Sequence, residues 1–263
     1  MGAEDRLKEL KLELPTARNF ADLANDIVDK FASSGRCNFV AEFSEPYAAR
    51  VTCVLLGLDQ SEWRRLADIT ADMGLALGVN FKQDVGKIDR ATDALFEYAH
   101  RVIEERRTRP AGDDFISQLL QANEDKDALS DQELYDMVVL AVFGGIDTTR
   151  NQLGLAMSMF VENPDQWRLL ADRPDLARNA VEEVMRVRPT TTWVTREAME
   201  DFTYRDLEFK RGITIHLFSE SAGTDPQHFT PGFDIAAQRK SHFGFGGGVH
   251  HCLGHFIARS DMT

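Results

Sequence analysis

Ten residues near the end of the chain hold the densest set of groups that could do chemistry: residues 245–254 read FGGGVHHCLG. Glycines let a backbone turn tightly and approach a flat ligand closely. A cysteine at the start of a helix meets backbone N–H donors and the positive end of the helix dipole, which favour its thiolate. Because the thiolate is the form of cysteine that ligates a metal, this segment predicts an iron site with Cys252 as its single thiolate ligand.

Three other interpretations of this segment are weaker. Zinc would suit Cys252 and the nearby histidines by type, but neighbours in one turn rarely converge on a tetrahedral centre, and no second ligand pair lies at zinc-finger spacing. A phosphate-binding loop would need Lys-Ser/Thr after the glycines, and no strand–loop–helix dinucleotide fingerprint fits. The remaining alternative is a glycine-rich loop with a buried, inert cysteine.

A second segment, residues 144–149, reads GGIDTT inside an apolar-rich stretch. A glycine within a helix lowers its stability by about 1 kcal/mol relative to alanine, so a glycine pair there indicates a close approach or a local distortion. Asp147 followed by Thr148 places an acid beside a hydroxyl, a pair able to deliver protons. Thr148 could instead hydrogen-bond to a carbonyl of the preceding turn, as threonines within helices often do.

A third segment pairs two opposite charges. Glu183 and Arg186 are three residues apart, which places both on one face of a helix. An isolated pair of this kind is usually a surface ion pair worth about 0–1 kcal/mol.

In their order and spacing, the three segments resemble the signature sequences of the cytochrome P-450 family. Residues 245–254 match the family's haem-binding signature, F-G-x-G-x-H/R-x-C-x-G, at every specified position, and residues 144–148 match its oxygen-binding motif, A/G-G-x-D/E-T. The family's E-x-x-R motif falls between them, as Glu183 and Arg186 do here. The resemblance implies a haem-thiolate protein in which Cys252 is the axial ligand of the iron of haem b (iron protoporphyrin IX).

The resemblance also implies roles for residues around the haem. Phe245 would pack beside the cysteine sulfur, Gly248 would permit the turn, and Gly254 completes the signature. His250 would reach one haem propionate, and Arg196, in the segment VTRE, would meet the other. A strand-edge arginine without a ligand is the other interpretation of Arg196. The histidines at positions 251 and 255 fall at variable positions of the signature and imply only surface or packing roles.

For the oxygen-binding motif, the resemblance implies that Asp147 and Thr148 deliver protons during the activation of dioxygen. They would do so in a groove that opens at Gly144 and Gly145. The E-x-x-R pair would be structural and would hold the core beneath the haem.

The elements that must position these residues are predicted to be mainly α-helical, with a minor β portion. Helical periodicity covers most of the first 188 residues, including a helix from Ser44 to Gly57. Ser130 and Glu133 form a capping box that opens a helix reaching about residue 162. Beyond Pro189, short β-like runs are expected at residues 193–196, 207–209 and 213–215. A loop-rich stretch is expected at residues 225–248, and a last helix is expected to begin near Cys252.

The predicted organisation is a single partial cytochrome P-450-like domain over residues 1–263. Its functional parts are the oxygen-motif helix at about 131–162, the E-x-x-R helix at about 175–188 and the haem-thiolate loop at 243–254.

The fold is expected to be incomplete, because the family domain extends beyond this chain at both ends. Residues 5–20 resemble the later part of the family's C helix, where Lys8 would be a substitute propionate partner. At the other end the chain stops inside the helix that follows Cys252. In the interior, Gly232 stands where the family often has an arginine that completes a Glu-Arg-Arg network.

Composition argues against several classes of protein. The 263 residues include 30 basic and 43 acidic ones, a formal net charge of −13, and so acidic a chain repels nucleic-acid phosphates. The longest apolar stretch, residues 137–143, is shorter than the ~20 residues that cross a bilayer. No signal-peptide pattern opens the chain, so no membrane partner and a cytoplasmic location are expected. Three cysteines without a C-x-x-C pair argue against a disulfide framework.

The function that the resemblance implies is that of a soluble, bacterial-type haem-thiolate monooxygenase, which inserts one oxygen atom from dioxygen into a small apolar organic substrate. Electrons would come from NAD(P)H through a reductase and a ferredoxin or flavodoxin-type donor. The alternative is a truncated, non-catalytic haem-binding or partner-binding remnant of that family. A third possibility is a metal held by the histidine cluster without haem.

Overall fold

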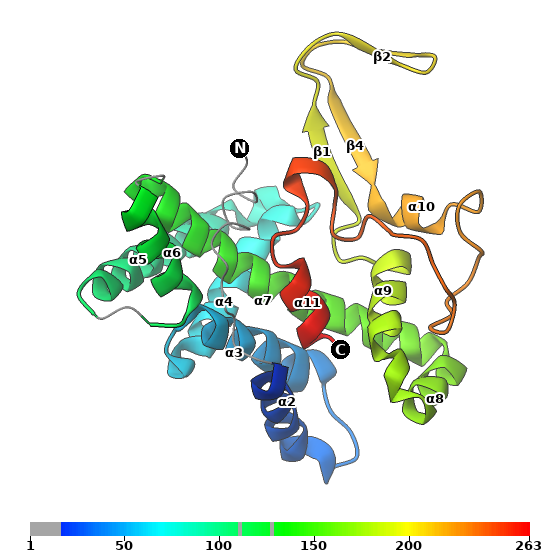
Figure 1. The fold of residues 1–263 in the computed structure, drawn as a ribbon, viewed down its shortest axis with the longest axis horizontal. Coiled ribbons are helices and arrows are strands. Elements are labelled where there is room, and N and C mark those ends of the chain that lie inside the picture. Colours follow the sequence, from blue (N-terminus) through cyan, green and yellow to red (C-terminus); the bar gives the residue numbers. More distant parts are fainter. Residues whose placement is uncertain (1–16, 110–111, 127–128) are drawn as a thin grey trace. The chain divides into compact units, whose positions relative to one another are not determined.

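The computed structural model describes residues 17–109, 112–126 and 129–263 (Figure 1). The chain divides into two compact units. The N-terminal unit comprises residues 1–154 and 260–262, and the C-terminal unit comprises residues 155–259 and 263. The boundary falls within helix α7 (Asp131–Glu162), so that one continuous helix belongs to both.

Helices build the N-terminal unit. Its elements are α2 (Ala17–Ala32), the π-helix η1 (Val40–Ser44), α3 (Glu45–Leu56), the 3₁₀ turn η2 (Gln60–Glu62), α4 (Trp63–Gly74), the 3₁₀ turn η3 (Leu75–Leu77), α5 (Phe81–Arg107), α6 (Phe115–Lys126) and most of α7. Helices α3 to α7 share one apolar core. Removal of this apolar surface from water is the main force that holds them together, and its fully buried members include Leu66, Leu95, Ile116, Val138 and Ile146.

Two helix boundaries follow local signals in the sequence. Helix α7 begins with the predicted capping box: Ser130 N–H donates to Glu133 Oε2 at 2.8 Å, and Glu133 N–H donates to Ser130 Oγ at 3.3 Å. Helix α3 ends at Gly57, whose φ of 70° lies in the left-handed region that favours glycine. Both boundaries therefore depend on residues within the helix ends themselves.

Arg106 joins three segments of the N-terminal unit beside Gly57. Its Nη2 donates to the Gly57 carbonyl at 2.6 Å, its Nη1 donates to Ser117 Oγ at 3.0 Å, and Nη1 also binds the Asp114 carboxylate. A Cβ added to Gly57 would lie 2.4 Å from Asp114 Cγ. Glycine is therefore needed there for its conformation and for space, whereas Gly35, with a φ of 67°, faces open space.

The C-terminal unit combines short helices with two small sheets. After the end of α7, its elements are α8 (Pro164–Asp172), the 3₁₀ turn η4 (Pro174–Leu176), α9 (Ala177–Val187), β1 (Trp193–Glu197), β2 (Phe202–Tyr204), β3 (Leu207–Phe209), β4 (Thr214–Phe218), α10 (Ser219–Thr224), the 3₁₀ turn η5 (Gly248–His250) and α11 (His255–Asp261), whose last two residues belong to the N-terminal unit. A small apolar cluster includes Phe160, Leu176, Ala180 and Ile235.

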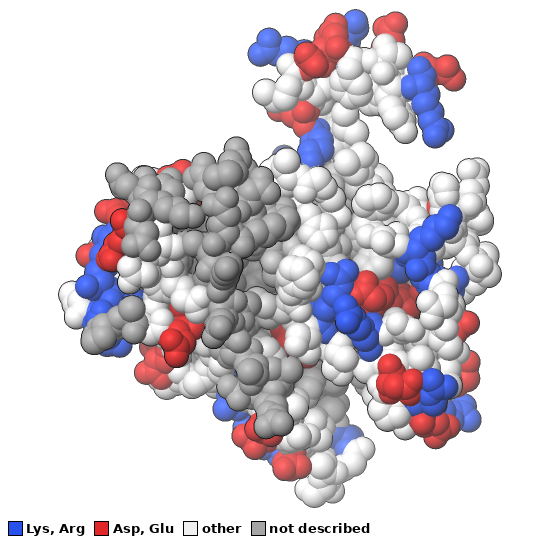
Figure 2. Space-filling view, in the orientation of Figure 1, with Lys and Arg blue, Asp and Glu red and all other residues white. Residues whose placement is uncertain are grey.

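Both sheets are antiparallel pairs. Strand β1 pairs with β4, with Arg196 opposite Ile215, and β2 pairs with β3, with Phe202 opposite Phe209. The β2–β3 hairpin carries charges of both signs, as Figure 2 shows at its upper edge, and Lys210 Nζ lies 3.0 Å from Asp201 Oδ2. Exposed ion pairs of this kind contribute little stability.

The predicted fold class, mainly α-helical with a minor β portion, is confirmed. Two helices and one strand were not expected from the sequence, namely α6, α10 and β2, and neither were the π-helix η1 and the 3₁₀ turns. The E-x-x-R helix is slightly shorter than predicted, because a 3₁₀ turn precedes α9.

The last helix begins later than predicted, at His255 rather than near Cys252. The reason is local: Cys252 N–H bonds to the carbonyl of Phe245, which keeps the cysteine in the loop.

Lys8, the predicted substitute propionate partner, lies outside the described residues. None of the described helices is both long enough and apolar enough to cross a membrane.

We expect Gly57→Ala to lower the free energy of unfolding more than Gly35→Ala does. Both substitutions force a left-handed backbone on alanine, at a cost of about 1–2 kcal/mol, but only the Gly57 variant also overlaps Asp114, which adds about 1–3 kcal/mol. Urea unfolding of the two variants measures the difference. Equal losses would show that the space beside Asp114 is not restricted.

Candidate functional site

Backbone hydrogen bonds close the loop of residues 243–254 on itself. Cys252 N–H donates to the Phe245 carbonyl at 2.8 Å, and Gly246 N–H donates to the Phe243 carbonyl at 2.8 Å. Gly246 and Gly248 have φ values of 73° and 67°, in the left-handed region. The loop therefore presents Cys252 from a fixed turn, just before α11.

The Cys252 thiol is half-buried. Burial raises its pKa, while the backbone N–H of Gly254 and the charge of Arg259 act in the opposite direction. The expected help from backbone N–H groups is thus present, but burial outweighs it. Of the other two cysteines, Cys37 is exposed, and Cys53 is fully buried with a pKa raised by burial to about 12.

The glycines of the loop have two different roles. A Cβ at Gly244 would lie 2.7 Å from the Met185 carbonyl of α9, so this glycine lets the loop pack closely on that helix. A Cβ at Gly248 or Gly254 would meet no atom within 4 Å. Around Cys252 the loop therefore leaves open faces, which a flat ligand requires.

The other residues predicted around the haem lie near the surface or in the loop. Phe245 is buried, and the guanidinium of Arg259 lies 4.4 Å from its ring centroid. His250 is exposed at the end of η5. Arg196 is half-buried on β1, donates to the Thr195 carbonyl at 2.9 Å, and has no carboxylate within ion-pair distance in the described part of the chain. A thiol, an imidazole and a guanidinium are the kinds of group that can hold haem iron and its propionates.

The E-x-x-R pair is buried and central, not a surface ion pair. The side chains of Glu183 and Arg186 are each only 2% exposed, and their two hydrogen bonds measure 2.8 and 2.7 Å. Arg186 also donates to the carbonyls of Gly223 and Gly232, at 2.6 and 2.8 Å. Such a buried pair is stable only when hydrogen bonds satisfy its remaining donors and acceptors.

A second arginine completes this network from an unexpected position. Arg239 Nη2 donates to Glu183 Oε1 at 3.0 Å, although Gly232 occupies the position where the family often has that arginine. Asp234 N–H donates to the same oxygen at 3.0 Å. Burial alone would raise the pKa of Glu183, but Arg186, the Asp234 amide and Arg239 hold it below its ordinary value.

In the N-terminal unit, Asp147 is buried and held by two neighbours on α7. Arg150 Nη2 donates to its Oδ1 at 2.5 Å, and Asn151 Nδ2 donates to its Oδ2 at 3.2 Å. Burial raises the pKa of Asp147, against the opposing effects of Arg150 and Asn151. Arg150 also donates to Glu45 Oε2 of α3, at 3.4 Å. Sequence reasoning missed both Arg150 and Glu45.

The hydroxyl of Thr148 donates to the carbonyl of Gly144, one turn earlier on α7. The alternative that the sequence left open, a threonine bonded to its own helix, is therefore the arrangement seen here. The two glycines differ: a Cβ at Gly144 would meet nothing within 4 Å, whereas one at Gly145 would lie 2.8 Å from Thr52 Oγ1 on α3. Gly144 leaves an open face, and Gly145 serves helix packing.

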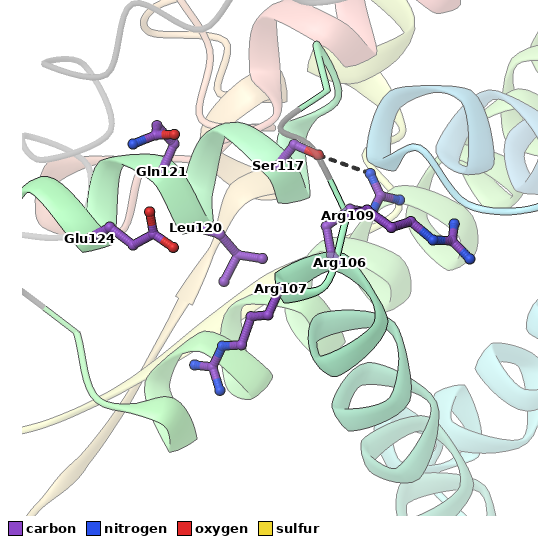
Figure 3. A pocket seen from close by; sticks show the side chains of 7 residues that line it. All are labelled: Arg106, Arg107, Arg109, Ser117, Leu120, Gln121 and Glu124. Carbon is purple, nitrogen blue, oxygen red and sulfur yellow. Dashed lines mark hydrogen bonds between the residues drawn. The ribbon is translucent and has the colours of Figure 1, made fainter.

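Two other features do not belong to this set of residues. A pocket of about 90 Å³ lies between the end of α5 and α6, and its lining includes Arg106, Arg107 and Arg109 at the end of α5 (Figure 3). No residue predicted for haem lines it. Within the described ranges, no three His, Cys, Asp or Glu side chains are grouped so that they could hold a metal ion, so the histidine cluster offers no such set there.

Opposite effects are expected when alanine replaces the two glycines of α7. Gly144→Ala should raise the free energy of unfolding by about 1 kcal/mol, the usual gain for alanine within a helix. Gly145→Ala should lower it by about 1–3 kcal/mol, because its Cβ overlaps the buried Thr52 hydroxyl group. Thr52→Ala should recover part of that loss in the double variant. Urea unfolding measures the free energy of unfolding of these variants. Equal effects at both glycines would contradict the conclusion that Gly145 packs against Thr52 while Gly144 faces open space.

Comparisons with known proteins give the same family as the resemblance of the sequence motifs. The sequence model of the cytochrome P-450 family matches residues 70–171 and 166–263. Luteothin monooxygenase from Streptomyces thioluteus is 35% identical over 242 residues, covering 90% of this chain and 59% of that protein. Mycinamicin IV hydroxylase/epoxidase from Micromonospora griseorubida is 31% identical over 269 residues, covering 98% of this chain and 66% of that protein.

Solved structures give the same family. The bacillaene polyketide synthase cytochrome P-450 PksS from Bacillus subtilis 168 matches with a TM-score of 0.86 and 28% identity, covering 98% of this chain and 68% of that one. The chain thus spans about three fifths to two thirds of the length of these relatives. Because the family model covers more than half of the chain and includes the cysteine loop, the chain belongs to the cytochrome P-450 family, whose members hold haem through a cysteine thiolate.

Proposed function

We propose that this chain provides the haem-binding part of a monooxygenase that inserts one oxygen atom from dioxygen into a small apolar organic substrate. Two relatives at 31–35% identity are named as a monooxygenase and as a hydroxylase/epoxidase, which supports an oxygenase. The electron donor we propose is a ferredoxin or flavodoxin-type protein supplied by an NAD(P)H reductase. A location in the cytoplasm, where NAD(P)H is found, belongs to the same proposal.

The observation that carries this proposal is the closed loop that presents Cys252. Its thiol is half-buried, and Gly248 and Gly254 leave the space beside it open. We propose haem b as the group that this loop holds. When bound, haem supplies the iron centre at which dioxygen is activated and the substrate is oxidised.

The residues of this chain have separate tasks in that proposal. The Cys252 thiolate would ligate the iron, and Phe245, whose side chain is buried, would pack beside the sulfur. His250 and Arg196 bind the two propionates. Gly254 and the open face at Gly248 allow the backbone to approach the ligand closely.

We propose that Asp147 and Thr148 move protons, in a groove formed where Gly144 lacks a side chain and Gly145 lets α7 pack closely on α3. Burial raises the pKa of Asp147, which brings this carboxyl nearer to the range useful for proton transfer. Thr148 must turn its hydroxyl away from the Gly144 carbonyl to donate elsewhere. Asp147 must correspondingly loosen its contacts with Arg150 and Asn151.

Haem supplied to the chain should give a reduced carbon-monoxide complex with the strongly red-shifted Soret band of thiolate ligation. Cys252→Ser should abolish that band, because no thiolate remains in the loop. Cys37→Ser, which alters an exposed thiol, is the matched control and should leave it unchanged. A histidine-like band, or no haem binding at all, would contradict the proposed ligand. A thiolate band without any product from substrates would support a non-catalytic haem-binding protein.

Replacing the two proton-carrying groups should separate electron use from product formation. Thr148→Ala is expected to keep NAD(P)H consumption but release peroxide in place of product. Asp147→Asn should slow turnover by about 100-fold, the usual order for losing a positioned proton donor. Thr148→Ser, which keeps a hydroxyl, is the control. Product formed per NAD(P)H consumed is the quantity to measure, and unchanged coupling in Thr148→Ala would exclude its role.

A further inference from the structure

One carboxylate of α9 contacts residues on both sides of the cysteine loop. Glu182 Oε2 lies 3.0 Å from Nε2 of His242, which directly precedes the loop of residues 243–254. The same carboxylate binds Arg259, which follows that loop: Nη2 lies 3.2 Å from Oε2, and Nε donates to Oε1. All of these residues belong to the C-terminal unit. Glu182 thus connects two positions that are 17 residues apart in the sequence.

The hydrogen bonds of His242 fix the position of its ring proton. Gly244 N–H donates to Nδ1 of His242 at 3.0 Å. Since a backbone N–H only donates, Nδ1 accepts, and the proton of the imidazole is on Nε2, where it is donated to Glu182. The His242 side chain is only 4% exposed, so the ring acts as a buried link between Glu182 and the start of the loop.

Arg259, the other partner of Glu182, contacts Phe245, the residue predicted to lie beside the cysteine sulfur. The Arg259 guanidinium, oriented by Glu182, lies 4.4 Å from the ring centroid of Phe245, a cation–π distance. Its Nη1 also lies 2.7 Å from Nδ1 of His255. Burial opposes ionisation of Glu182, but hydrogen bonds from His242 and Arg259 lower its pKa to about 2. The carboxylate is therefore charged at any physiological pH.

We propose that Glu182 is a positioning residue for the thiolate ligand, because it ties His242 and Arg259 together across the base of the loop that carries Cys252. This role rests on the proposed haem ligation by Cys252, but the contacts belong to the protein alone. It differs from that of the adjacent Glu183, which binds Arg186 and Arg239. Two neighbouring carboxylates of α9 therefore serve two separate sets of partners.

Hydrogen–deuterium exchange of the haem-free chain of 263 residues tests the contacts without any haem chemistry. Glu182→Gln removes charge-assisted hydrogen bonds to Arg259, and a Gln amide cannot accept on both sides as a carboxylate does. Loss of such bonds should speed amide exchange in residues 243–254 by about tenfold or more. Glu162→Gln is the matched control, since Glu162 is an exposed carboxylate of the same unit whose two oxygens bind Arg188 at 2.8 and 2.9 Å. It should leave exchange in the loop unchanged.

The haem-loaded chain provides the second readout. Transfer of haem to excess apomyoglobin should be roughly tenfold faster from Glu182→Gln than from the unsubstituted chain, as is usual when an outer-shell partner of a metal ligand is lost. The thiolate-type carbon-monoxide band should decrease in favour of the histidine-like band. Glu162→Gln should match the unsubstituted chain in both measurements.

A second variant separates positioning from general stability. His242→Asn keeps an acceptor for Gly244 N–H but does not reach Glu182, so it should show the same changes at a smaller size even if Glu182→Gln folds poorly. Loop exchange and haem transfer that are equal in Glu182→Gln, His242→Asn and Glu162→Gln would overturn the proposal. If the unsubstituted chain lacks the thiolate band, the proposed function fails, and loop exchange alone then decides whether Glu182 holds the loop.

Discussion

The arrangement of the C-terminal unit depends on the buried ion pair between Glu183 and Arg186. Each side chain is 2% exposed, and removing such charges from water carries a penalty of several kcal/mol for each ion. Here the penalty is offset by near-complete hydrogen bonding, in which Arg239 and the Asp234 amide bind the carboxylate and two backbone carbonyls accept from the guanidinium. Polar contacts therefore help to hold the irregular chain after α10 in place, together with the buried side chain of Ile235.

Helix α9 supports the cysteine loop through contacts from about one helical turn, residues 182–185. Glu182 binds groups on either side of the loop, Glu183 binds the segment that leads to it, and the Met185 carbonyl lies so close to Gly244 that no side chain fits there. These contacts suit the proposed ligand role of Cys252, because the geometry of a metal ligand depends on the partners behind it.

Helix α7 holds the two groups proposed to move protons in a different way. Asp147 is engaged by Arg150 and Asn151, and Thr148 by the carbonyl of Gly144, so both groups already have hydrogen-bond partners within α7. The helix interior is packed at Gly145 and open at Gly144. The proposed proton transfer would therefore require these existing hydrogen bonds to exchange. The proposed structural role of Glu183 requires no such exchange.

The sequence by itself determined the features that depend on neighbouring residues: the start of α7 at its capping box, the end of α3 at Gly57, and the motif that identifies Cys252. These are local, because each involves residues within about one helical turn or one loop. Contacts across the chain were decided by tertiary structure. Glu182 meets His242 60 residues later, and Arg239 reaches Glu183 across 56 residues, although the sequence pointed to position 232. No periodicity or spacing encodes such partners, since burial and hydrogen-bond satisfaction select them only when the elements have packed.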